Sequence, residues 1–258
     1  MSKLIQTIEH VGKSIPAPMG FVRSARSQEA PQVLVIASTN HWQKSTDIIS
    51  DAKPDALLLN IEHKSFETLI KTGVPSPETP WGLVINESAS TDFTALKASG
   101  CDFIVLKTLD IPVSQLQDDN LGRILQVPKD LEKEEAHALE DLPIDAVYLA
   151  EPASLPISLQ DLMVLSAFRN EIPKPVILSV SEVPSVWEME CLRNIGIECV
   201  LIDFDSHNSQ SIVDLKTIIK GLPKRKARND KLTATLPEAV LGSIDDQDDQ
   251  DDEDDQEI

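Results

Sequence analysis

The chain has 258 residues, of which 41% are hydrophobic, and a formal net charge of -20. This length and hydrophobic content suffice for one large buried core, and α/β barrels use about this length as a single domain. The excess of acids argues against nucleic acid as a partner, because affinity for phosphates comes from Lys and Arg. A membrane span is also excluded, since no run approaches about 18 uninterrupted apolar residues.

The cysteines predict the redox environment of the protein. Cys101, Cys191 and Cys199 form no CxxC pair, and two of them fall at or inside predicted strands, where a buried thiol behaves as a small apolar group. Residues 1–20 lack the apolar core of a signal peptide. We therefore expect a reduced, cytoplasmic protein.

An extra helix is predicted in the first segment, residues 1–30. Within 2–13, Leu4, Ile8 and Val11 follow helical spacing, and Pro16, Pro18 and Gly20 then stop the helix. We expect this helix to cover one end of the domain. A helix that binds a membrane surface or a partner is the alternative.

A repeated pattern organises the next part of the chain. In residues 100–107, a small residue is followed by an acid, four apolar residues and a closing polar residue, and the pattern returns in 53–60, 143–151 and 196–203. The four acids are spaced by 47, 43 and 53 residues, which fits two strand-helix units per repeat; they are Asp55, Asp102, Asp145 and Glu198.

Eight apolar runs of strand length are predicted in total. The four repeats alternate with the runs 33–38, 83–87, 123–127 and 176–181. Segments with helical periodicity separate nearly all of them: 41–52, 64–71, 91–99, 131–142, 159–171, 186–194 and 210–220. The exception is 109–121, where Pro112 and the acids near 118 leave room for only a short helical turn.

Strands that are apolar on both faces and joined by helices are parallel and buried. Eight such units close most simply into a (β/α)8 barrel, and residues 31–222 resemble the TIM-barrel superfamily in architecture. An open doubly wound sheet is the alternative. Residues 223–258 hold a basic cluster and then ten acids from Asp245 to Ile258, so we expect a charged linker and a disordered acidic tail.

The chemistry of such a barrel lies where its strands end. Side chains alternate along a strand, so Lys107 is expected to face a partly enclosed space with Glu62, Asp203 and Asp205. Lys107 then either forms a structural ion pair with these acids or acts as a reactive amine. In the second case the acids are candidate general bases. Further polar residues that close strands are candidates for substrate binding: Asn60, Asn86, Ser179 and Glu151.

A lysine on the fourth strand resembles the Schiff-base lysine of class I aldolases of the transaldolase type. The resemblance rests on Lys107 alone and implies that its amine attacks a carbonyl substrate. Those enzymes also use an acid on the first strand, and here Thr39 and Asn40 stand in that region.

A divalent metal ion is a candidate cofactor. His41, His63 and His207 follow strands one, two and eight, which are neighbours in a closed barrel. Together with the acids Glu62, Asp203 and Asp205 they form a plausible ligand set, and solvated or capping histidines are the alternative.

The predicted loops after strands seven and eight contain acids and no glycine, which disfavours a phosphorylated substrate or a nucleotide cofactor. Two functions therefore remain open. One is a small-molecule lyase or aldolase that acts at the barrel mouth. The other is a non-catalytic barrel that binds a protein partner through its surface and acidic tail. The sequence does not fix the oligomeric state.

Overall fold

A computed structural model of the chain describes residues 1–12, 31–41, 43, 45–61, 78–86, 93–118 and 120–223, with the backbone alone described at 45–47 and 49. Residues Met1–Arg225 cluster as one compact unit. The predicted helix 64–71 and the acidic tail lie outside the described residues. None of the described helices is long and apolar enough to cross a membrane.

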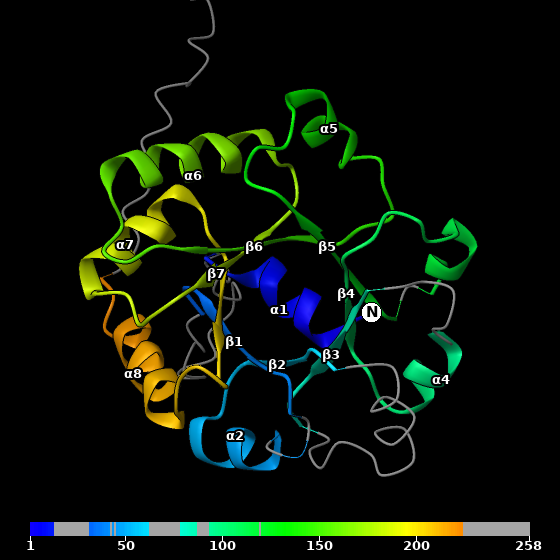
Figure 1. The fold of residues 1–258 in the computed structure, drawn as a ribbon, viewed down its shortest axis with the longest axis horizontal. Helices are drawn as coiled ribbons and strands as arrows, with labels where there is room; N and C mark the ends of the chain where they lie inside the picture. Colours follow the sequence, from blue (N-terminus) through cyan, green and yellow to red (C-terminus); the bar gives the residue numbers. More distant parts are fainter. Residues whose placement is uncertain are drawn as a thin grey trace, which may run out of the picture. The chain divides into compact units, whose positions relative to one another are not determined.

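Eight parallel strands close a barrel in the order of the sequence (Figure 1), which confirms the (β/α)8 prediction and excludes the open sheet. Each strand pairs with the next in the chain, and β8 pairs with β1. The strands are β1 Leu34–Thr39, β2 Ala56–Leu59, β3 Trp81–Ile85, β4 Phe103–Leu106, β5 Gly122–Val127, β6 Ala146–Ala153, β7 Val176–Val180 and β8 Cys199–Asp203.

The described helices surround the barrel, except for one that lies across it (Figure 1). They are α1 Lys3–His10, α2 Ser45–Ala52, α4 Phe93–Ala98, α5 Lys133–Ala138, α6 Leu159–Glu171, α7 Val186–Ile195 and α8 Ser209–Lys220. Between β4 and β5 the chain makes only the short 3-10 helix η2 (Val113–Leu116), as the sequence predicts. Strand β3 begins two residues before the predicted run, because Trp81 and Gly82 already pair with β2 and β4.

The four repeated acids stabilise the end of the barrel at which the strands begin. Three of them accept the backbone N–H of the preceding strand: Val35 N donates to Asp55 (2.8 Å), Arg123 N to Asp145 (2.7 Å) and Val176 N to Glu198 (2.9 Å). A basic side chain pairs with each of the three, namely Lys216, Arg123 and Arg169. These three acids of the repeat therefore have a structural role in the barrel.

The fourth acid, Asp102, holds the N-terminal helix instead. Its carboxylate accepts hydrogen bonds from the Ser2 hydroxyl (2.7 Å) and from the backbone N–H groups of Lys3 (2.8 Å) and Leu4 (2.9 Å). An acid at this position satisfies free N–H groups in the first turn of a helix. The apolar face of α1 is consequently buried in the barrel, as expected for a helix that covers one end.

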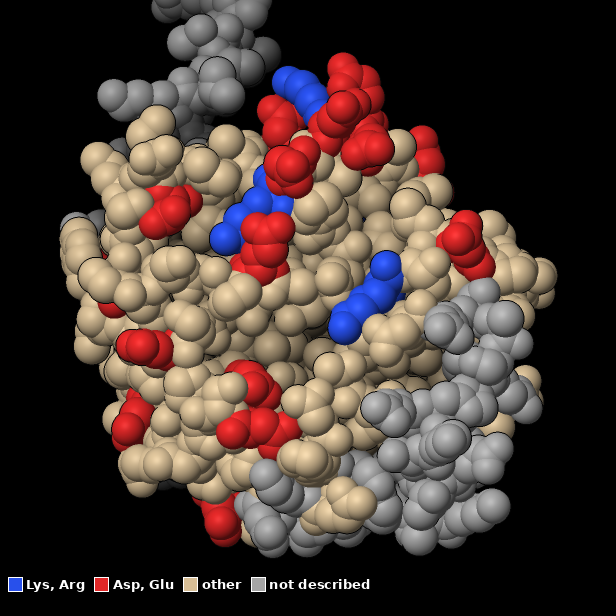
Figure 2. Space-filling view, in the orientation of Figure 1, with Lys and Arg blue, Asp and Glu red and all other residues tan. Residues whose placement is uncertain are grey.

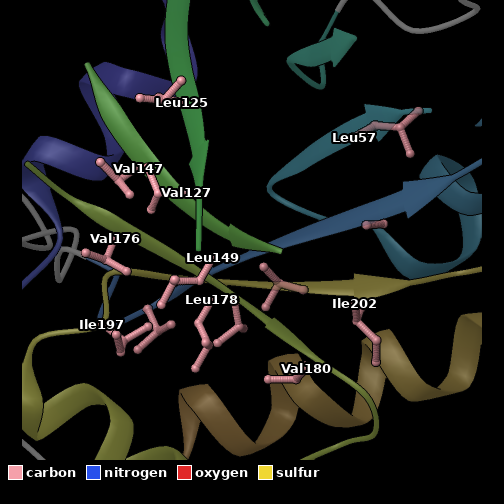
Figure 3. Packing of buried hydrophobic residues seen from close by; sticks show 14 of the residues in the cluster. Leu57, Leu125, Val127, Val147, Leu149, Val176, Leu178, Val180, Ile197 and Ile202 are labelled. Atoms are coloured by element: carbon pink, nitrogen blue, oxygen red, sulfur yellow. The ribbon is translucent and has the colours of Figure 1, made fainter. Parts of the chain in front are cut away.

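Two apolar layers form the core. The inner layer fills the barrel and includes Leu58, Val105, Ile177 and Leu201, as expected from the alternation of side chains along a strand. The outer layer lies between strands and helices, where Val180 and Ile202 point toward α8 (Figure 3). At the end of the barrel where the strands begin, Leu4, Ile5 and Ile8 of α1 close the inner layer.

The burial of two cysteines predicts slow thiol chemistry. Cys199 lies in the barrel interior and Cys101 just before β4, and burial raises the pKa of both thiols above the ordinary value. Burial and the charge of Glu190 raise the pKa of Cys191 as well, so the expected difference rests on exposure. We expect iodoacetamide at neutral pH to modify only the partly exposed Cys191 in the native protein, slowly, and the other two after denaturation. Peptide mass spectrometry checks this, and rapid native labelling of Cys199 would contradict the packing of β8.

Candidate functional site at the barrel mouth

The strands end at the face shown in Figure 2, where the surface is hollowed near the barrel axis and acidic side chains are more frequent than basic ones. The polar residues that close the strands gather at this end, because all eight strands are parallel. The mouth is therefore where the candidate side chains can meet.

Asp203, the last residue of β8, lies in a network of hydroxyl groups. Ser206 donates to its Oδ2 at 2.6 Å and Ser38 of β1 to its Oδ1 at 3.4 Å, while the backbone N–H of Asp205 lies 3.3 Å from Oδ1. These donors fix the orientation of the carboxylate. Asp203 is partly exposed and so remains accessible from the mouth.

Asp205 joins the end of β8 to the end of β1. Its carboxylate accepts hydrogen bonds from the hydroxyl of Thr39 (3.1 Å) and from the backbone N–H of Asn40 (2.6 Å). The Asn40 side chain in turn accepts a bond of 2.9 Å from Asn60 at the end of β2. Two of the predicted site residues, Asp205 and Asn60, are thus linked through Asn40.

A tyrosine that sequence reasoning missed lies beneath Asp203. Tyr148 of β6 belongs to the inner layer and is nearly buried, and burial raises the pKa of its phenol above the usual value. The charge of Asp203 acts in the same direction, whereas a hydrogen bond with Ser179 of β7 opposes it. Tyr148 is therefore protonated at neutral pH and can donate a hydrogen bond.

Gln126 of β5 is a second missed residue. It pairs with Tyr148 in the sheet register, and its Oε1 atom is buried without a hydrogen-bond partner within the described part of the chain. An acceptor of this kind calls for a donor from a ligand or water. The signals in the sequence were a polar residue inside an apolar strand and the chain's single tyrosine.

Lys107 follows β4 and is exposed at the mouth. No hydrogen bond or ion pair joins its amine to any described residue, so the predicted ion pair with Asp203 or Asp205 is not formed in this structure. Glu62, the other predicted acid, lies outside the described residues. The choice between a structural ion pair with Glu62 and a reactive amine therefore stays a prediction.

The remaining predicted residues are spread around the rim. Glu151 is exposed, and its Oε2 atom lies 3.9 Å from Nζ of Lys129. Its neighbour Ala150 packs against the inner layer. Asn86 is exposed after β3. Neither is joined to the Asp203 network by a hydrogen bond that the structure shows among the described residues.

The metal-binding prediction stays a prediction. His41 is exposed, His207 donates from Nε2 to the carbonyl oxygen of Ser181 at 2.7 Å, and His63 lies outside the described residues. Among the residues whose placement is described, no three His, Cys, Asp or Glu side chains are close enough to hold a metal ion.

Comparison with known proteins gives the fold and no family. No protein-family model and no curated protein matches the chain. Among solved structures, the tryptophan synthase α-subunit from Pyrococcus furiosus is similar at 15% identity with a TM-score of 0.54, over 74% of this chain and 98% of that one. Thiamine phosphate pyrophosphorylase from the same organism is similar at 12% identity with a TM-score of 0.53, over 73% and 96%. The likeness shows a TIM-barrel fold.

Proposed function

We propose that this protein is a small-molecule enzyme of the lyase or aldolase type, with its active site at the barrel mouth. The observation that carries the proposal is the amine of Lys107, which is exposed at the mouth and has no ion-pair partner among the described residues. An amine that forms no ion pair with a carboxylate is available to react with a substrate. Similar folds in tryptophan synthase α and thiamine phosphate pyrophosphorylase support a catalytic role in general terms.

In the proposed chemistry the Lys107 amine gives a proton to solvent and adds to the carbonyl carbon of the substrate. Loss of the carbonyl oxygen as water, with one proton taken up, leaves an iminium ion. A base then removes the proton of a hydroxyl group on the β-carbon, and the bond between the α- and β-carbons breaks. The β-carbon leaves as the carbonyl carbon of the first product, and the electron pair of the broken bond moves toward the iminium to give an enamine. Hydrolysis of the remaining enamine releases the second product and the free amine.

The described residues supply the other roles in this reaction. Asp203 is the candidate base, since its carboxylate is accessible and held by Ser38 and Ser206. Tyr148 and Gln126 offer a donor and a buried acceptor for substrate hydroxyl groups. Acids at Glu182 and Asp205 in the loops after β7 and β8 oppose a phosphate group, so the proposed substrate is an unphosphorylated hydroxy-carbonyl compound.

Trapping with borohydride tests the role of Lys107. The protein is incubated with small hydroxy-aldehydes and keto acids, reduced, digested and mapped by mass spectrometry. We expect the adduct on Lys107 and its loss in Lys107→Met, which should remain folded because the exposed side chain contributes little to stability, within about 0.5 kcal/mol. Lys129→Met is the matched control, because Lys129 also lies near the mouth but pairs with Glu151.

Labelling of Lys107 no faster than that of surface lysines would remove the Schiff-base proposal. The second candidate function, a non-catalytic interaction protein, would then be favoured. A specific observation supports it: large apolar side chains are exposed on α6 and α7.

A further inference from the structure

An apolar surface lies at the first turns of α6 and α7. Trp187 is 71% exposed, Leu159 76% and Met163 66%, and Val164 and Val186 are also exposed. We call these five residues the α6–α7 patch. Single exposed apolar residues are ordinary, but a group of this size on one face marks a contact surface.

The two helix starts lie side by side. The backbone N–H of Ile157, just before α6, donates to the Glu188 carboxylate in the first turn of α7 at 2.7 Å. Both helices begin with capping boxes, Ser158 with Asp161 and Ser185 with Glu188. These bonds fix the geometry of the α6–α7 patch, so the apolar side chains project from a rigid base.

Helix α6 carries apolar side chains on its outer face as well as on its inner face. Leu165 and Phe168 are buried against the barrel, while Leu159 and Met163 are exposed among polar residues such as Asn170. A surface helix normally has one apolar stripe, which faces the core. The two exposed side chains at the start of α6 therefore exceed what packing on the barrel requires.

We infer that the α6–α7 patch is the interface of a homodimer. The five side chains expose on the order of 600 Å², so two copies that meet through this surface bury about 1,200 Å², the lower bound of standard interfaces. In a twofold dimer the same patch lies on both sides, so apolar side chains of one copy meet apolar side chains of the other.

The charge of the chain favours this orientation between copies. With a net charge of -20, two copies of the chain repel each other at long range. Figure 2 shows a broad area over α6 and α7 with few charged side chains, among them isolated acids. Contact through this area brings few acids together, and added salt strengthens the dimer because it screens the remaining repulsion.

Sedimentation equilibrium of the full chain over about 1–200 µM tests the inference, a range suited to a small interface. We expect a monomer-dimer equilibrium that shifts toward dimer from low to high NaCl. The double substitution Met163→Glu with Trp187→Glu should weaken the dimer at least about 30-fold. Leu109→Glu is the control, since Leu109 is 79% exposed but lies between β4 and β5, away from the patch.

Circular dichroism at low concentration verifies that all variants keep the helix content of the wild type. The inference is overturned if the wild type stays monomeric across the range. It is also overturned if Leu109→Glu dissociates the dimer as strongly as the double variant.

Discussion

Replacing Phe103 by alanine is expected to lower the free energy of unfolding by about 3–5 kcal/mol, the cost of removing a fully buried aromatic ring. Phe103 is 0% exposed and lies in the inner layer of the barrel. Its ring packs so closely on Gly82 of β3 that a Cβ added to this glycine would clash with the ring carbons. The barrel is closed around this contact, so the cavity cannot collapse easily.

Denaturant unfolding measures this effect as a lower midpoint with an unchanged slope. Leu109→Ala is the matched control, because Leu109 is exposed and its loss should change stability by no more than about 0.5 kcal/mol. A loss below about 1 kcal/mol for Phe103→Ala would contradict the packing of the inner layer.

Replacing Asp102 by alanine should destabilise the protein by about 2–3 kcal/mol and loosen α1 selectively. The carboxylate accepts three hydrogen bonds from the start of α1, and these donors lose their partner in the variant. Amide hydrogen exchange should accelerate in residues 5–10 and remain slow in the strands.

Asp55→Ala is the control for this variant, because Asp55 is the equivalent acid before β2. Its carboxylate holds Val35 of β1 and Lys216 of α8, so faster exchange is expected there and not in α1. Equal acceleration of α1 in both variants would show that the four acids act on the barrel as a whole.

Much of this fold could be predicted because every strand of a parallel barrel has the same local requirements. Each buried strand needs an apolar run, and each strand start needs a partner for free backbone groups, so the pattern at Asp55, Asp145 and Glu198 recurs along the sequence. Alternation along a strand then placed Leu58, Val105 and their counterparts inside. Helix bounds were predicted closely where caps were clear, as at Ser158 and Ser185.

The candidate site was only partly predictable, because its residues are joined by contacts across the barrel. The sequence placed Lys107, Asp203 and Ser179 at the mouth. It could not show that Ser38 and Ser206 donate hydrogen bonds to Asp203, or that Tyr148 lies close enough to interact with this carboxylate. Those contacts depend on strand register and barrel closure, which join residues far apart in the chain.

The sequence by itself determined the barrel, since the period of its apolar runs and acids follows from the local geometry of strands and helices. Only the tertiary structure decided how each copy of the pattern is used. Asp102 lies in the same local pattern as the other acids, yet it holds α1, because that helix reaches the start of β4 from 98 residues away in the chain. The hydrogen-bond partner of Asp102 therefore depends on tertiary packing, and a local sequence pattern cannot predict it.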